Sequence, residues 1–368
     1  MTLNNMKISK FPKKSLLSIL FFLPIILSFI GLFFVFEASS VKSFNEFGDS
    51  FHFFRLQLLW IGLGIAAMVF FSFLDYHKLY YLSFLFMLST IIFLFIVLIP
   101  GIGQQAGGAR RWIDLGITNF QPTELAKFSV IIYLASWFFK KERQRFFSFI
   151  TLLGTLMLLI ILQPDMGTAT IVFFLSVSLY YLAGIDLFYL FLLIPAAAGG
   201  FYLLVKISPY RLKRLLAFFN PSLDPLGITY HINQILISLG NGGLLGRGLG
   251  ASRQKYYYLP EAHTDSIFAI VAEEFGFVGS AAIILIFLFL IYKMYQVIVG
   301  TQDRFAKLLA GGVFAFFNLQ ILINLGGIAK IMPLTGVPLP FISYGGSNLL
   351  VSFALMGILI NIAKKSKL

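Results

Sequence analysis

The 368-residue sequence contains no cysteine, and only 12% of its residues are charged. Without cysteine, the chain can form neither a disulfide framework nor a thiolate metal site. None of its histidines forms an i, i+4 pair, which argues against a histidine zinc site; they are His52, His77, His231 and His263. Soluble domains carry roughly 25% charged residues, so the low charge argues against a water-soluble fold.

Hydrophobic side chains dominate the rest of the composition. They make up 59% of the residues, aromatic side chains make up 17%, and the mean hydropathy is +0.89. A soluble core cannot hide this fraction, because the water-facing surface must also be covered. The net charge of +13 would suggest nucleic acid in a soluble protein. Here the cations flank apolar runs, which indicates membrane topology and anionic lipid, with no nucleic acid partner.

Apolar runs long enough to cross a bilayer recur along the chain. A hydrocarbon core of about 30 Å needs roughly 20 apolar residues as a helix. We therefore predict an all-α polytopic membrane protein with a single transmembrane domain over residues 16–363, between basic segments at 1–15 and 364–368. About ten transmembrane helices are expected near residues 16–36, 53–74, 79–100, 123–139, 148–163, 167–184, 187–205, 266–292, 308–326 and 347–363.

Three clusters of basic residues predict the orientation. One precedes the first span, one falls between the fourth and fifth, and one follows the last: Lys7, Lys10, Lys13 and Lys14; Lys140, Lys141, Arg143 and Arg145; Lys364, Lys365 and Lys367. An even number of spans places all three clusters on one side, which the positive-inside rule makes cytoplasmic, with both termini there. Residues 206–265 then form a long extracytoplasmic loop between the seventh and eighth spans. Its apolar stretches, 232–239 and 256–259, predict order, with short helices at the interface.

Polar residues gather between the third span and the start of the fourth. Arg110 and Arg111 offer fork-shaped donors that suit phosphate, and the alternative is an anchor to lipid headgroups. Gln121 precedes the fourth span, and Glu124 and Lys127 have the i, i+3 spacing of an intrahelical ion pair. Charges at membrane depth usually face a polar interior and mark function. A purely structural pair explains the same spacing.

Carboxylates also occur where spans begin. Asp165 either caps the sixth helix or faces the same polar cavity. Asp265 lies at the start of the eighth span, where it can accept a proton or hold a divalent cation such as Mg²⁺ or Mn²⁺; the alternative is an N-cap. Glu273 and Glu274 lie about two turns further on and must be paired, protonated or exposed to a wet interior. By helical angle, Glu273 is closer to the Asp265 face.

Residues 333–347 contain three prolines and three glycines and cannot form a regular spanning helix. Irregular backbone at membrane depth must be buried in protein or line a cavity. Ser343 and the backbone of Gly345 and Gly346 can present hydroxyl and N–H groups to an oxyanion. A tight loop that re-enters the protein without binding a ligand is the alternative.

Cations and carboxylates therefore surround the outer mouth of a helical bundle. A lipid-linked phosphate fits this pattern, because cations such as Arg211, Lys213 and Arg214 suit its phosphates. Lipid suits its tail, and a carboxylate suits proton transfer. His263, two residues before Asp265, is a further candidate for substrate contact. This pattern does not separate an enzyme from a transporter or a lipid-binding scaffold.

The clusters, in this order, resemble the SEDS family (shape, elongation, division and sporulation), the polytopic peptidoglycan polymerases of bacteria. The ordered set is specific, although each motif alone is weak: Gly108–Ile113, Gln121–Lys127, Gln163–Thr168, Pro209–Asn220, Asn241–Gly250, Leu259–Gly279 and Pro338–Ser347. The run from Tyr258 to Asp265 is more similar to the division branch than to the elongation branch. Asn348 departs from the family pattern, in which a second serine is common.

The resemblance implies a glycosyltransferase that polymerises lipid II, a disaccharide-pentapeptide on undecaprenyl diphosphate, into glycan strands outside the membrane. It assigns the family's essential aspartate to Asp265, its cavity glutamate–lysine pair to Glu124 and Lys127, and its tight-turn aspartate to Asp165. It implies a class B penicillin-binding protein and other divisome membrane proteins as partners, a septal location in the cytoplasmic membrane, and no organic cofactor. A lipid II flippase, an elongation polymerase and a division scaffold are the alternatives.

Overall fold

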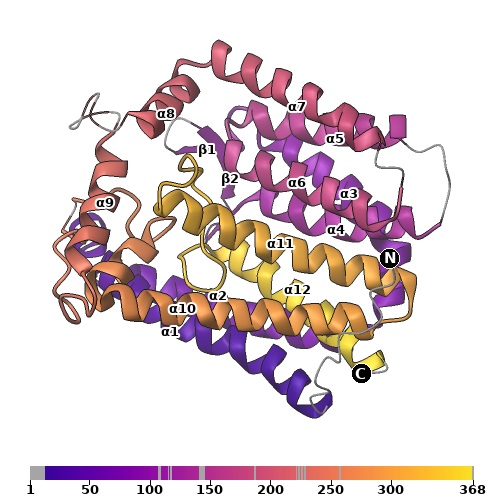
Figure 1. The fold of residues 1–368 in the computed structure, drawn as a ribbon, viewed down its shortest axis with the longest axis horizontal. Coiled ribbons are helices and arrows are strands. Elements are labelled where there is room, and N and C mark those ends of the chain that lie inside the picture. The colour runs from indigo at the N-terminus through magenta and orange to yellow at the C-terminus, as the bar shows by residue number, and fades with distance from the viewer. Residues whose placement is uncertain are drawn as a thin grey trace.

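The computed structural model describes residues 13–106, 109–114, 116, 118–140, 146–185, 188–220, 222, 224, 227, 229–256 and 258–366. Helices dominate this part of the chain (Figure 1): α1 Lys13–Phe47, α2 His52–Phe73, α3 Tyr76–Ile96, α4 Pro122–Phe139, α5 Phe146–Leu162, α6 Met166–Leu182, α7 Phe188–Ile207, α8 Pro209–Phe219, α9 Tyr230–Gly242, α10 Ile267–Gly300, α11 Arg304–Ile328 and α12 Gly346–Lys365.

Each of the ten predicted spans coincides with a helix, although some boundaries differ: α3 ends at Ile96, four residues before its predicted end. Six helices are long and apolar enough to cross a membrane, namely α1, α2, α3, α10, α11 and α12. α5, α6 and residues Leu193–Lys206 of α7 are apolar but shorter. α4 carries Glu124 and Lys127 near its start. The predicted all-α polytopic membrane fold is confirmed.

The first helix is longer than predicted. α1 continues to Phe47, beyond the expected end at residue 36. Residues 37–47 contain neither glycine nor proline, and Glu37 is held by Lys255 at 2.7 Å. The helix ends where Gly48 takes a positive φ of 70°, a conformation that favours glycine.

A small antiparallel sheet between α3 and α4 was not predicted. It consists of β1 (Gly103–Ala106), β2 (Ala109–Asp114) and β3 (Asn119–Phe120), paired in that order. The register between β1 and β2 shifts at Gln104 and Gln105. Strands this short carry no regular alternation of apolar residues, so hydrophobic periodicity does not predict them. β2 carries Arg110 and Arg111.

The two ends of the described chain lie together. Lys13 donates a hydrogen bond to the carbonyl of Ser366 at 2.6 Å, and Lys365 pairs with Asp75 at 2.6 Å. Figure 1 shows α8, α9 and the sheet at the opposite end of the bundle. This arrangement agrees with an even number of spans. Six of the predicted topogenic cations lie outside the described residues: Lys7, Lys10, Lys141, Arg143, Arg145 and Lys367.

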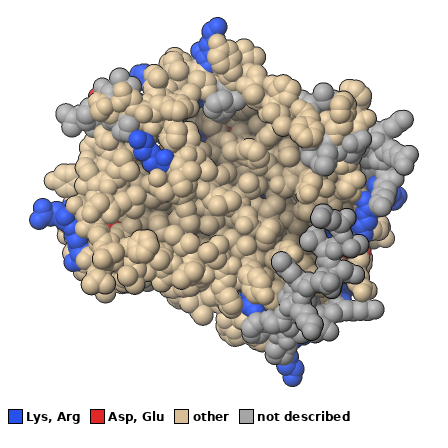
Figure 2. Space-filling view, in the orientation of Figure 1, with Lys and Arg blue, Asp and Glu red and all other residues tan. Residues whose placement is uncertain are grey.

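The core of the bundle lies around α12. In its apolar stretch 83% of the residues are buried, against 22% in α10, so α12 packs centrally and α10 presents most of its surface outward. α12 contacts α1, α2, α4, α10 and α11. The face in Figure 2 is made almost entirely of uncharged residues, with Lys and Arg mostly near its edges, as lipid contact requires.

The described part of the predicted loop, residues 206–265, contains helices. The apolar stretch 232–239 lies within α9, while residues 256 and 258–259 form no helix, although Leu259 is buried. α8 begins at Pro209 and carries Arg211, Lys213 and Arg214. The loop therefore adds two short helices at the end of the bundle where Asp265 lies.

Candidate functional site

A kink in α10 connects this helix to the glycine-rich segment after α9. At Gly276, φ is +63°, and the regular helical hydrogen bonds are interrupted. The N–H groups of Phe277 and Val278 donate to the carbonyls of residues 243 and 244, at 2.9 and 3.1 Å. In return, the N–H groups of residues 247 and 248 donate to the carbonyls of Glu273 and Glu274, both at 3.0 Å. Residues 243–248 therefore exchange backbone hydrogen bonds with α10 where its own helical hydrogen bonds are interrupted.

The side chains of Glu273 and Glu274 are buried at this junction and are both paired. Ser252 donates to Glu273 at 2.5 Å, and Lys255 lies 3.7 Å from Glu274. Lys255 also holds Glu37 of α1 at 2.7 Å. Each of the two carboxylates therefore has a protein partner at this junction.

Residues 333–345 form the irregular segment expected from the sequence, and side-chain amides hold it. Gln320 donates to the carbonyl of Pro338 at 3.1 Å, and Gln57 donates to that of Ser343 at 3.3 Å. The Ser343 hydroxyl is buried and accepts a hydrogen bond from the Leu339 N–H at 2.8 Å. The interior of the protein therefore satisfies this backbone, as irregular structure at membrane depth requires.

Gly345 and Gly346 stand where this segment becomes α12. A Cβ on Gly346 would lie 2.0 Å from the Trp60 ring, so only glycine fits between them. Ser347, the next residue, accepts a hydrogen bond from the Gln121 N–H at 3.1 Å. The start of α12 thus meets the start of α4. The predicted role of Ser343, Gly345 and Gly346 in holding an oxyanion stays a prediction.

Asp265 is half-buried and lies between α9, α11 and the irregular segment. Its backbone carbonyl accepts a hydrogen bond at 2.8 Å from Asn324, which also donates to the carbonyl of Val337 at 2.8 Å. One carboxylate oxygen lies 3.4 Å from the Ser266 hydroxyl. The other faces Gly336, where an added Cβ would lie 3.7 Å away. The carboxylate therefore sits at the junction of the two segments singled out from the sequence.

The electrostatic surroundings raise the affinity of Asp265 for a proton. Burial, followed by the nearby charge of Glu261, raises the pKa of Asp265 to about 7, and Arg214 opposes this shift. Arg214 reaches the same segment and donates to the carbonyl of Leu334 at 3.3 Å. A carboxyl group with this pKa can exchange a proton near neutral pH.

His263 is buried rather than open to substrate. Its ring packs against Phe53 and Tyr344, with centroid distances of 4.8 and 5.6 Å, and its carbonyl accepts from the Tyr344 N–H at 2.9 Å. Burial lowers the pKa of His263 to about 4, so its ring is neutral. These contacts favour a packing role for His263 beside Asp265.

A second cluster joins the starts of α4, α6 and α12. Lys127 and Glu124 form an ion pair at 2.6 Å, and their side chains are only 1% and 3% exposed, so the predicted pair is fully enclosed. Asn348 donates to the other Glu124 oxygen at 3.0 Å. The residue that departs from the family pattern therefore completes the hydrogen bonding of the buried carboxylate.

Asp165 caps α6 and also reaches toward this cluster. Its carboxylate accepts from the N–H and hydroxyl of Thr168, at 3.0 and 2.8 Å, which confirms the capping geometry. Gln121 lies 3.5 Å from the same carboxylate. The cap and the contact with Gln121 coexist, whereas the expectation that Asp165 faces a polar cavity stays a prediction.

The predicted cations differ in what they contact. Arg111 donates to the carbonyl of Gln163 at 3.1 Å and to that of Pro164, so it ties the sheet to the Asp165 turn. Arg211 points to carbonyls of residues 204 and 161 at 3.3 and 3.4 Å. Arg110 is half-buried on β2, and Lys213 is exposed on α8. Of the predicted cations, Arg214 has the clearest electrostatic link to Asp265.

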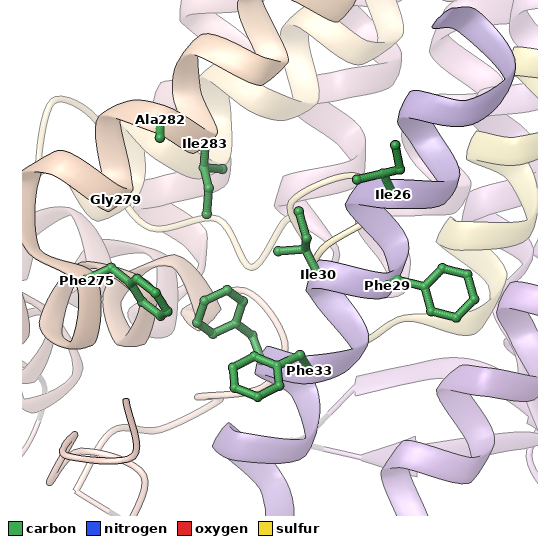
Figure 3. Close-up of a pocket in the computed structure, with 9 residues that line it drawn as sticks. Ile26, Phe29, Ile30, Phe33, Phe275, Gly279, Ala282 and Ile283 are labelled. Carbon is green, nitrogen blue, oxygen red and sulfur yellow. The ribbon is translucent and has the colours of Figure 1, made fainter. Parts of the chain in front are cut away.

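A separate concave feature lies between α1 and α10, with a volume of about 660 Å³. Its lining residues are all apolar; they include Phe29 and Phe33 of α1 and Phe275, Gly279 and Ile283 of α10 (Figure 3). None of the predicted site residues lines it. The groove is therefore distinct from the polar site.

Sequence reasoning missed three side chains of the site, namely His231, Ser266 and Asn324. Asn324 had a usable signal, because a polar amide inside an apolar span needs a partner. His231 and Ser266 had none, since their contact joins residues far apart in the chain.

The residues near Asp265 do not form a metal cage. Within the described part of the chain, no three His, Asp or Glu side chains are grouped to hold a metal ion. Glu261 is the carboxylate linked to Asp265, through the hydroxyl of Thr264 at 2.9 and 3.5 Å.

Comparisons with known proteins agree with this architecture. A family model described as a cell cycle protein, covering FtsW, RodA and SpoVE, matches residues 17–368. Stage V sporulation protein E of Bacillus subtilis is 38% identical over 355 residues, which cover 95% of this chain and 97% of that protein. A probable peptidoglycan glycosyltransferase FtsW of Coxiella burnetii is 38% identical over 351 residues, covering 92% and 93%.

Solved structures share the fold. One, described as "Structural coordination of polymerization and crosslinking by a peptidoglycan synthase complex", aligns with a TM-score of 0.77 and 25% identity, covering 95% of this chain and 97% of that chain. The rod shape determining protein RodA of Thermus thermophilus aligns with a TM-score of 0.69 and 24% identity, with the same coverage of 95% and 97%. The resemblance found in the sequence is confirmed: this chain belongs to the FtsW/RodA/SpoVE family of cell cycle proteins, the SEDS family.

Proposed function

We propose that this chain is a peptidoglycan glycosyltransferase that polymerises lipid II into glycan strands at the outer face of the bacterial cytoplasmic membrane. The observation that carries the proposal is the half-buried Asp265 carboxylate, whose pKa is raised to about 7, at the end of the bundle opposite Lys13 and Ser366. The names of relatives, including the probable glycosyltransferase FtsW, support the same reaction class.

Asp265 acts as the general base. It takes the proton from the 4-hydroxyl of the acceptor sugar, and that oxygen attacks the anomeric carbon of the donor. The bond from this carbon to the diphosphate breaks, and the diphosphate leaves with the electron pair. A positioned base contributes about 10²–10⁴-fold, because a protonated hydroxyl is a poor nucleophile.

Cations offset the charge of the departing diphosphate, an effect that usually contributes at least as much as the base. Arg214, which acts electrostatically on Asp265, and Arg110 of the neighbouring sheet are the residues we assign to this task. Lys127 is less suited than the sequence suggested, because Glu124 neutralises it inside the protein. The Glu124–Lys127 pair instead fixes α4 against α12. A divalent cation carried by the diphosphate itself stays a proposal.

The cellular setting is also a proposal. A relative in fold belongs to a peptidoglycan synthase complex, which supports a class B penicillin-binding protein as the partner that cross-links the new strand. Relatives named FtsW, together with the similarity of residues 258–265 to the division branch, support a septal location and contact with other divisome membrane proteins. Lys13 and Ser366 lie together at one end of the bundle, and the positive-inside rule supports a cytoplasmic location for both termini.

Purified protein, supplied with lipid II and assayed with and without its cognate transpeptidase, tests the proposal. Glycan strands resolved by electrophoresis are the expected product. Lipid II transport in vesicles without any polymer would instead assign the site to a flippase. Failure of both activities, with partner recruitment intact, would leave a scaffold.

A further inference from the structure

His231 of α9 contacts the residue that precedes α10. Its Nε2 lies 2.8 Å from the hydroxyl of Ser266. Ser266 is fully buried, directly follows Asp265 in the chain, and stands at the N-cap position of α10. Its hydroxyl also lies 3.4 Å from the Asp265 carboxylate. The hydroxyl is thus placed between the imidazole and the proposed base.

The chemistry of these three groups fixes the direction of their hydrogen bonds. An ionised carboxylate only accepts, so the single proton of the Ser266 hydroxyl must point to Asp265 when this residue is ready to act as a base. The hydroxyl oxygen can then accept from His231 only if Nε2 carries a proton. Burial, and then the positive charge of Arg214, lower the pKa of His231 to about 4, with Glu261 opposing them. A neutral ring carries one N–H, which the contact requires at Nε2.

We propose that His231 is a positioning residue for Asp265 and acts through the Ser266 hydroxyl. The chain of donors, from His231 to Ser266 to Asp265, holds the carboxylate in one rotamer and links its orientation to α9. This inference rests on the proposed function of Asp265. It adds a residue that touches neither substrate nor the reacting atoms.

A different residue holds the backbone of Asp265, so the position of its backbone and the orientation of its side chain can be tested separately. Asn324 fixes the carbonyl of Asp265 from α11, whereas His231 and Ser266 act on the side chain. Loss of His231 should therefore leave substrate binding intact and misdirect the base. The expected signature is a fall in kcat with little change in KM.

Four full-length variants test the inference in the lipid II polymerisation assay: His231→Leu, His231→Gln, Ser266→Ala and the double variant His231→Leu with Ser266→Ala. Leucine removes the donor, whereas glutamine keeps a neutral N–H donor. We expect about a tenfold loss of kcat for His231→Leu and for Ser266→Ala, and near wild-type kcat for His231→Gln. The double variant should be no slower than either single variant, because both act through one hydroxyl.

Wild-type kcat for His231→Leu, or multiplying losses in the double variant, would overturn the inference. A readout without turnover separates it from the proposed function. The ¹⁵N spectrum of the imidazoles in the purified chain, assigned by difference from His231→Gln, should show His231 as the Nε2–H tautomer, with a shift in Ser266→Ala. An Nδ1–H tautomer would refute the positioning role, even if the wild type forms polymer. If the wild type forms no polymer, the proposed function is refuted. The tautomer of His231 then still tests its hydrogen bond to Ser266.

Discussion

Asn324 donates a hydrogen bond at 2.8 Å to the backbone carbonyl of Asp265, and a second at 2.8 Å ties it to Val337. One side chain of α11 thus joins the proposed base to the irregular segment before α12. Replacing Asn324 with Leu keeps the volume but leaves two buried carbonyls without donors. We expect a loss of about 1–3 kcal/mol in unfolding free energy and at least tenfold lower polymerisation.

Asn318 provides the matched control on the same helix. Its side chain donates to the carbonyl of Phe314, within α11 itself, at 2.8 Å. Asn318→Leu should therefore change stability by well under the loss seen for Asn324→Leu. Thermal unfolding in detergent and the initial polymerisation rate measure both variants. Equal effects at the two positions would contradict the bridging role of Asn324.

The enclosed pair Glu124–Lys127 should be sensitive to single substitutions. Lys127→Met leaves a buried carboxylate with Asn348 as its remaining hydrogen-bond donor, and we expect about 3–5 kcal/mol of destabilisation. Adding Glu124→Gln removes the unpaired charge and should recover most of that loss. The comparison is made by thermal unfolding of the single and double variants.

An exposed pair supplies the control for this prediction. Arg55 and Asp49 lie 2.5 Å apart, but their side chains are 69% and 35% exposed. Arg55→Met should therefore cost about 1 kcal/mol at most. If Lys127→Met is no worse than Arg55→Met, the buried pair contributes nothing beyond a surface contact.

The hydrogen bonds between the glycine-rich segment after α9 and the kink of α10 predict that alanine substitutions at two glycines destabilise the protein unequally. Gly246 and Gly248 both have positive φ, 84° and 97°. A Cβ on Gly246 would lie 2.0 Å from the carbonyl of Glu274, whereas a Cβ on Gly248 would meet nothing within 4 Å. Gly246→Ala should therefore destabilise the protein far more than Gly248→Ala, which reports backbone strain alone. Equal melting temperatures for the two variants would show that close packing of Gly246 against α10 does not stabilise the kink.

The raised pKa of Asp265 predicts the pH dependence of polymerisation. A general base works only when ionised, and burial raises the pKa of this carboxyl from 3.8 to about 7. Activity should therefore fall as the pH drops through about 7, where an exposed aspartate would still be ionised. The acidic limb of kcat/KM against pH measures this. An acidic limb near pH 4 would exclude Asp265 in the surroundings described here.

Sequence reasoning located the spans and the site because their signals are local. Apolar runs of bilayer length define helices such as α2, and the spacing of Glu124 and Lys127 predicts their pair directly. The partners of Glu273 were hidden, since Ser252 meets it only after the segment inserts into the kink at Gly276. The contacts of Arg211 could not be predicted either, because they depend on how α5 and α7 pack: the carbonyls of residues 161 and 204 accept hydrogen bonds from its side chain.

The most direct test of the account compares wild type with Asp265→Asn in lipid II polymerisation, with the partner transpeptidase present. Asparagine keeps the shape and removes the basicity, and Asp49→Asn, at another carboxylate outside the site, serves as the control. We expect glycan strands from the wild type and the control, and none from Asp265→Asn, although all three proteins are folded. Wild-type rates from Asp265→Asn would contradict the assignment of Asp265 as the catalytic base.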